Sequence, residues 1–164
     1  MFPIHRILHP TDFSEQSKAA FEVACALARD YSAELVILHV YSTPPVFAPD
    51  GIAVPLPSED PYRARVQLNE IQPTDTNVKV RQILVEGNPV DQILRHARTE
   101  AVDLIVMGTH GSTGLARMLM GSVAESVTRK STCPVLTLRK PFHPNPENVI
   151  VDARLIAEPV TAVG

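Results

Sequence analysis

The sequence predicts an α/β fold in which an open five-stranded parallel sheet is covered by helices on both faces, a doubly wound arrangement. Strand-length apolar runs alternate along the chain with segments whose apolar residues recur at helical spacing. The run from Leu35 to Leu38 contains no polar residue, which is typical of a parallel strand buried on both faces. With 164 residues, 45% of them hydrophobic, the chain is long enough for one domain with a substantial core.

The first half of the chain contains two predicted strands, two predicted helices and one irregular segment. A strand over Ile4–His9 stops at Pro10 and is followed by a helix over Ser14–Tyr31, with Ser14 as its capping residue. The apolar run over Ala33–Tyr41 predicts the second strand. The proline-rich segment Thr43–Pro61 shows almost no periodicity and is interpreted as an irregular loop. A short helix over Tyr62–Ile71 then ends before Pro73.

The second half repeats the strand and helix alternation. Val78–Val85 predicts a third strand, and Pro89 is well placed to begin a helix that runs to about Thr99. Val102–Met107 predicts a fourth strand, which leads into a glycine-containing loop and a helix ending near Lys130. The fifth strand is expected over Pro134–Leu138. Because each strand is followed by a helix, the connections are crossovers and the sheet is parallel.

Composition excludes several classes of protein. The formal net charge of −3 gives no basic surface for nucleic acid, so no nucleic-acid partner is expected. The chain begins with Met1-Phe2-Pro3 and has no long apolar run, so neither a signal peptide nor a membrane partner is expected and the predicted location is cytoplasmic. Two cysteines are too few for a disulfide scaffold and are interpreted as buried thiols.

The loop after the fourth strand carries the strongest functional signal. It reads Gly108-Thr109-His110-Gly111-Ser112-Thr113-Gly114 and continues to Gly121-Ser122-Val123. Ligands of open α/β sheets bind beyond the carboxyl ends of the strands, where glycines let backbone N–H groups approach a phosphate. Gly121 is expected to need both freedom of φ and close approach, and Ser122 begins a helix whose N-terminus attracts anions. The loop lacks the Gly-Lys-Ser/Thr of a P-loop and the dinucleotide fingerprint.

These residues resemble a known family. The spacing Gly108-x-x-Gly111, nine residues, Gly121-Ser122 resembles the ATP-binding motif of universal stress proteins. The opening Ile7–Ser14, the strand end Leu38-His39-Val40 and the segment Cys133–Leu136 also resemble that family, in the same order along the chain. The resemblance spans residues 3 to 140. It implies a Rossmann-like sheet related to that of the adenine nucleotide alpha-hydrolases, and commonly a homodimer paired through the fifth strand.

The resemblance also implies roles for individual residues. Asp12 would contact the adenosine part of ATP, with Pro10 and Thr11 lining the same wall and Val40 meeting the adenine through its backbone. The phosphates would be held by Gly108, Gly111, Gly121, Ser122 and Val123. A carboxylate suits ribose hydroxyls or an exocyclic amine and repels a triphosphate, although Asp12 could instead be a helix-capping aspartate. The loop contains no lysine, so ATP is expected together with Mg²⁺ bound through phosphate oxygens and water.

Two other groups of residues give weaker evidence of function. His39 and His110 are placed to face the same cleft, but no third ligand accompanies them, so no metal site is expected. Ser122, His110 and Asp12 could be drawn as a hydrolase triad, but the sequence has no nucleophile elbow. No residue is an evident general base for an attacking water, so no catalytic residue is assigned and the protein is at most a weak ATPase.

The expectation is therefore a domain over residues 1–140 that binds ATP in stress response or signalling, acting through nucleotide-dependent conformation or partner binding. A proline-rich extension over residues 141–164 follows it. The alternative is a dimeric scaffold, or a protein that binds another small ligand and interacts with partners without a nucleotide. The irregular Thr43–Pro61 segment and the apolar patch in the extension motivate that alternative.

Overall fold

The computed structural model describes residues 3–43, 45–47, 53–55, 59–109 and 120–139. The elements, in chain order, are β1 (Arg6–Thr11), α1 (Glu15–Tyr31), β2 (Glu34–Tyr41), β3 (Pro45–Phe47), β4 (Ala53–Pro55), α2 (Pro61–Glu70), β5 (Val80–Glu86), α3 (Pro89–Thr99), β6 (Leu104–Gly108), α4 (Ser122–Lys130) and β7 (Val135–Leu138). The extension over residues 141–164 lies outside the described residues. No helix in the described ranges combines the length and apolarity needed to cross a membrane.

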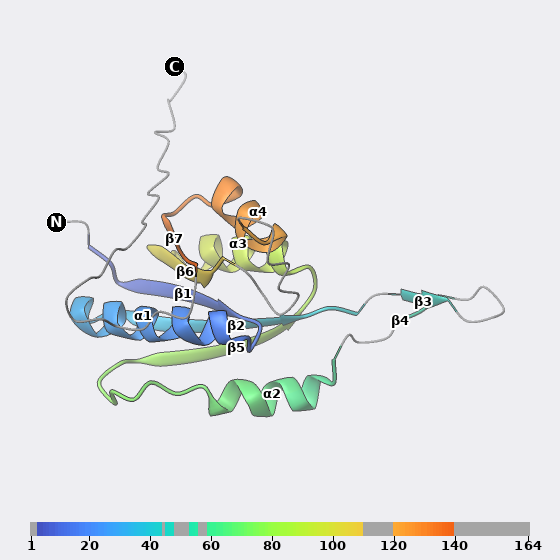
Figure 1. Cartoon of the computed structure of the whole chain (residues 1–164), viewed down its shortest axis with the longest axis horizontal. Helices are drawn as coiled ribbons and strands as arrows, with labels where there is room; N and C mark the ends of the chain where they lie inside the picture. Colours follow the sequence, from blue (N-terminus) through green and yellow to red (C-terminus); the bar gives the residue numbers. More distant parts are fainter. Residues whose placement is uncertain (1–2, 44, 48–52, 56–58, 110–119, 140–164) are drawn as a thin grey trace, which may run out of the picture.

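Five strands form one parallel sheet in the order β5-β2-β1-β6-β7, which confirms the predicted doubly wound fold. The chain winds outward in one direction from β1 to β2 and β5, and in the other direction from β6 to β7. The strand order therefore reverses between β1 and β6. Figure 1 shows α1 and α2 on one face of the sheet, with α3 and α4 on the other.

The core consists of two layers, because alternate residues of the central strands point to opposite faces. Ile7 of β1 and Leu35 and Ile37 of β2 pack in the layer that includes α1 and α2. Leu8 and Leu38, from the same strands, pack in the layer that includes α3 and α4. All five side chains are at most 1% exposed, so the continuous apolar runs of the sequence correspond to strands covered on both faces, as predicted.

The first strand begins and ends two residues later than predicted. It continues through Pro10 to Thr11, which pair in register with Leu38 and His39 of β2. Proline lacks an N–H and is tolerated only where the ladder does not need that donor. The register with β6 covers Ile7 and Leu8, before Pro10, so the proline lies at the end of the strand.

The proline-rich segment after β2 was predicted to be irregular, and this prediction was wrong for part of it. Strands β3 and β4 form an antiparallel hairpin in which Val46 pairs with Val54 and Pro45 with Pro55. Figure 1 shows the hairpin extending away from the main sheet. The two strands pair with each other and not with the main sheet. The prolines at the end of this pairing therefore remove no hydrogen bond from the main sheet.

The amino edge of the sheet is held by a network of ion pairs. Glu34 accepts from Arg6 Nε at 2.7 Å and from Arg81 Nε at 3.1 Å, and Arg81 also pairs with Glu100 at 2.6 Å. The hydrogen bond from Arg6, together with Arg81, holds the pKa of Glu34 below its usual range. These charges join the starts of β1, β2 and β5 to the end of α3.

Gly87, between β5 and α3, adopts a φ of +143°, a conformation that is essentially restricted to glycine. Its N–H donates to the Tyr41 carbonyl at 2.9 Å. We expect Gly87→Ala to lower the free energy of unfolding by about 1–3 kcal/mol through backbone strain. Chemical denaturation measures this change.

A Cβ at position 87 would also lie 2.7 Å from Nε2 of Gln92. Introducing Gly87→Ala into a Gln92→Ala background separates the two effects. Strain predicts the same loss in both backgrounds, whereas a loss that disappears with Gln92→Ala would attribute it to the side-chain contact.

Candidate functional site

The candidate site lies at the carboxyl edge of the sheet, where the strand order reverses between β1 and β6. Ligands of open α/β sheets bind at this kind of position. Asp12 follows β1 directly, Val40 lies near the end of β2, and Gly108 ends β6. Gly121 and Ser122 begin α4. Gly111 lies outside the described residues, so its predicted role stays a prediction.

The turn after β1 is held by Asp12. Its Oδ1 accepts from the Ser14 N–H at 3.1 Å and from the Ser14 hydroxyl at 2.6 Å. Ser14 in turn caps α1 by accepting from the Ser17 N–H at 3.2 Å. The capping residue is therefore Ser14, as predicted, and Asp12 orients the cap instead of capping the helix itself.

Pro10 and Thr11 do not line the same wall with their side chains. Alternation along β1 places Pro10 with Leu8, on the α3 and α4 side. The Thr11 side chain lies on the opposite side, where its hydroxyl accepts from Ser17 Oγ at 2.8 Å. The Thr11 carbonyl accepts from His39 Nδ1 at 2.7 Å. On the Pro10 side, Thr11 can therefore contribute only through its backbone.

Val40 lies on the same side as Pro10. Its half-buried side chain packs against the α3 and α4 layer of the core. It pairs with Val85 of β5, so its main chain is fixed within the sheet. This position allows a backbone contact with a ligand at the sheet edge while the side chain fills the core.

Gly108 is a point of close approach between β6 and α1. A Cβ at this position would lie 3.2 Å from Cβ of Gln16 and 3.3 Å from its backbone carbonyl. Glycine at this position therefore allows the first turn of α1 to pack against the end of β6. Sequence reasoning assigned Gly108 only to phosphate contact and missed this packing role, because Gln16 is distant in the chain.

The start of α4 is positioned by the end of the sheet. Thr109 N donates to the Leu138 carbonyl at 2.8 Å, and Gly121 N donates to the Thr109 carbonyl at 2.7 Å. Gly121 is the N-cap of α4 and makes no side-chain capping bond. Such an end presents backbone N–H groups with a partial positive charge. Ser122 is exposed beside it.

The expected need for unusual backbone freedom at Gly121 is wrong. Gly121 has a φ of −71° and a ψ of 152°, an extended conformation that any residue adopts. The backbone conformation at this position therefore does not require glycine. Val123, two residues later, packs against the α3 and α4 layer of the core and fixes the orientation of the helix start.

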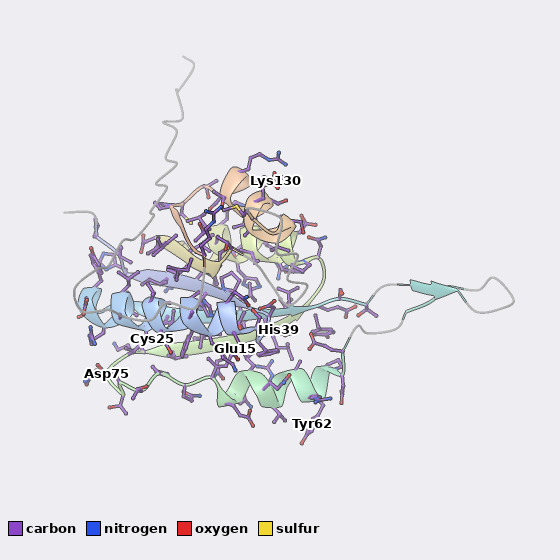
Figure 2. The ribbon with its side chains drawn as sticks, in the orientation of Figure 1. Glu15, Cys25, His39, Tyr62, Asp75 and Lys130 are labelled. Carbon is purple, nitrogen blue, oxygen red and sulfur yellow. The ribbon has the colours of Figure 1, made fainter. Side chains whose placement is uncertain are left out.

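His39 does not face the side of the sheet on which Val40 packs. Its buried ring donates from Nδ1 to the Thr11 carbonyl, and Nε2 lies 2.6 Å from Oε1 of Glu59. His39, labelled in Figure 2, is 4% exposed. Sequence reasoning missed Glu59, which lies beyond the hairpin. His110 is outside the described residues.

The described residues contain no group of three or more acidic, histidine or cysteine side chains arranged to hold a metal ion. Burial raises the pKa of Cys25 to about 12 and also raises that of Cys133, so both thiols stay protonated at neutral pH. The expectation that the cysteines are buried thiols agrees with their partial burial.

Comparison with known proteins identifies the family. The family model described as the universal stress protein family matches residues 3–139. The chain belongs to the universal stress protein family. Universal stress protein MJ0531 of Methanocaldococcus jannaschii is 34% identical to it over 147 residues, which cover 83% of this chain and 82% of that protein.

A second sequence relative and two solved structures agree with the family and the fold. Universal stress protein MJ0577 of the same organism is 33% identical over 82% of this chain and 94% of that protein. The structure of MJ0577 superposes with a TM-score of 0.69 and 30% identity, covering 84% of this chain and 97% of the other. A universal stress protein in complex with cAMP superposes with a TM-score of 0.60 and 25% identity, covering 84% and 98% of the two chains.

This universal stress protein has a buried histidine, His9, whose protonation affects stability. His9 is fully buried, and burial lowers its pKa to about 4 from an ordinary value of 6.5. The folded state therefore binds fewer protons than the unfolded state between these values. We expect the free energy of unfolding to be highest above pH 6.5 and to fall by up to about 3 kcal/mol as the pH approaches 4.

Denaturation curves of the wild type and of His9→Gln across this pH range test the expectation. His9→Gln should show a shallower pH dependence. His96, whose pKa burial also lowers, is present in both proteins and cancels in the comparison. An NMR titration that places the His9 ring near its ordinary pKa would contradict the interpretation.

Proposed function

We propose that the protein binds ATP, together with Mg²⁺, at the carboxyl edge of the sheet, and acts in stress response or signalling through nucleotide-dependent conformation or partner binding. The observation that carries the proposal is the presence of a carboxylate and a helix N-terminus at the reversal point of the sheet. Asp12 follows β1, and the N-terminus of α4 follows β6, the neighbouring strand. The family member whose structure contains cAMP supports an adenine nucleotide as the ligand class.

The two halves of the site suit different parts of a nucleotide. A carboxylate accepts hydrogen bonds, so Asp12 would accept from the ribose hydroxyls. Its bonds to Ser14 hold the carboxyl group in one orientation before a ligand arrives. Pro10 and the Val40 backbone lie on the α3 and α4 side of the same edge, where the adenine would pack.

The phosphates would lie at the start of α4. Backbone N–H groups near Gly121 and Ser122 attract anions because of their geometry and the helix dipole. The Ser122 hydroxyl is exposed and can donate to a phosphate oxygen. Gly108 and Gly111 are the other proposed phosphate contacts, with Val123 contributing its backbone. Phosphate oxygens and water would supply the ligands of Mg²⁺, which commonly keeps part of its hydration shell.

The first test identifies the ligand directly. Denaturing freshly purified protein and analysing the supernatant by chromatography and mass spectrometry should release ATP or ADP in near-stoichiometric amounts. If none is released, calorimetry with added ATP and Mg²⁺ should show saturable binding. Failure of both measurements would contradict the proposal and favour a scaffold that works without a nucleotide.

Substitution at Asp12 tests the ribose contact. Asp12→Asn keeps an oxygen that can accept from Ser14 but removes the charge, and we expect ATP affinity to fall by about tenfold or more, since a hydrogen bond to a charged group contributes about 1.5–3 kcal/mol. Asp30→Asn is the matched control, because Asp30 is exposed at the other end of α1. Equal ATP affinity in Asp12→Asn and Asp30→Asn would exclude a role for the Asp12 charge.

We also propose that the protein is a homodimer paired through β7. This strand lies at one edge of the sheet, with β6 on its other side. The carbonyls of Pro134 and Leu138 accept from Ile105 N and Thr109 N of the β6 side. By alternation, the backbone polar groups of Val135 and Thr137 point away from β6. No strand within the described ranges pairs with this edge, so we propose that a second copy does.

Analytical ultracentrifugation at micromolar concentration should show a dimer for the wild type. Thr137→Pro removes an outward N–H without removing a bond to β6, so we expect it to shift the population toward monomer. Thr137→Ala keeps that N–H and should remain dimeric. A wild-type protein that sediments only as a monomer would contradict the proposed pairing.

A further inference from the structure

A cavity lies on the face of the sheet opposite Pro10 and Val40. Its volume is about 290 Å³, and it opens between α1 and α2. Three of the polar side chains that line it are buried, those of His9, Thr11 and Ser17, each at most 8% exposed. Buried polar groups of this kind are costly unless they make hydrogen bonds. The hydrogen bonds of the three side chains therefore define what the cavity can accept.

His9 presents a hydrogen-bond acceptor to this cavity. Its Nδ1 lies 2.9 Å from the Val106 carbonyl, which can only accept, so Nδ1 carries the ring hydrogen. The ring is neutral at physiological pH because burial lowers its pKa to about 4. Nε2 therefore carries a lone pair. The nearest hydroxyl, Ser17 Oγ, lies 3.5 Å away, at the upper limit for a hydrogen bond.

Of the hydroxyl groups of Ser17 and Thr11, one keeps its hydrogen to donate to a ligand. Ser17 Oγ donates to Thr11 Oγ1 at 2.8 Å, so its single hydrogen is used there and not on His9. Thr11 Oγ1 also accepts from the Phe13 N–H at 3.2 Å. With both of its lone pairs occupied, Thr11 retains its own hydrogen for donation. The polar residues thus combine an acceptor on His9 with a donor on Thr11.

The remaining lining favours an uncharged ring. Phe13, Phe21 and Ile71 supply aromatic and aliphatic surface. The lining includes one basic and one acidic side chain, Lys18 and Glu70, so its formal charges balance. The formal charge of the lining therefore favours neither an anion nor a cation. A dry cavity of about 150 Å³ can hold benzene, so this one has room for a substituted ring.

We propose that the cavity between α1 and α2 is a binding site for a small uncharged aromatic hydroxyl compound of the phenol class. The ligand hydroxyl would donate to His9 Nε2 and accept from the Thr11 hydroxyl, while its ring packs against Phe13, Phe21 and Ile71. The site is separate from the proposed nucleotide site, because the β1 side chains that line it point to the other face of the sheet.

The experiment uses the full chain with p-cresol as the probe and its O-methyl ether as the matched compound, which cannot donate. Titration followed by NMR of the imidazole nitrogens and backbone amides gives both affinity and location. We expect saturable binding of p-cresol, a shift of the His9 Nε2 resonance, and binding of the ether that is weaker by about tenfold, equivalent to about 1.4 kcal/mol. Absence of saturable p-cresol binding, or equal affinity for the ether, would overturn the proposal.

Two variants locate the probe without disturbing the buried residues. Gln67→Trp fills the cavity from α2, and we expect it to abolish p-cresol binding. Val66→Trp places the same side chain at a neighbouring position that is 41% exposed, and should bind p-cresol as the wild type does. Unfolding midpoints confirm that both variants fold. Unchanged p-cresol binding in folded Gln67→Trp would place the probe elsewhere and overturn the assignment.

Discussion

The position of β1 at the centre of a parallel sheet is the constraint on which the rest of the structure depends. Helices cover both faces of the sheet at this strand, so each of its side chains must pack into one of the two layers of the core. Leu8 and Pro10 face the layer of α3 and α4, whereas Ile7, His9 and Thr11 face that of α1 and α2. One strand end therefore supplies groups to both proposed sites, and strand alternation determines which residue lies at which site.

The turn after β1 has a fixed geometry, which determines where the residues that follow the strand lie. Phe13 adopts a φ of 64°, which is uncommon for a residue other than glycine. Its N–H donates to Thr11 and its ring packs against His39, with ring centroids 4.2 Å apart. Asp12 and Ser14 on either side are joined by two hydrogen bonds. The strained residue is thus held by contacts on both sides, and it keeps the Asp12 carboxylate at the sheet edge.

Most of the fold follows from local patterns, whereas the parts that sequence reasoning missed depend on distant contacts. Apolar runs located the five sheet strands, and the serine and proline signals placed the starts of α1 and α3 correctly. The close approach of Gly108 to Gln16 could not be predicted, because it joins segments that meet only in the folded sheet. The hydrogen bond between His39 and Glu59 could not be predicted either, because the whole hairpin separates the two residues in the sequence. The site residues could be named from a motif, but their division between two faces required the β1 register.

The crossover from β2 to α2 has a consequence for how the chain can vary in length. Its two ends are anchored independently of what lies between them, by the Gly87 N–H on the Tyr41 carbonyl and by Glu59 on His39. The entropic cost of closing a loop rises by only about 0.6 kcal/mol for each doubling of its length. Insertions or deletions within the hairpin region should therefore leave the sheet register intact, which makes this crossover a natural place to graft a reporter peptide or a foreign epitope.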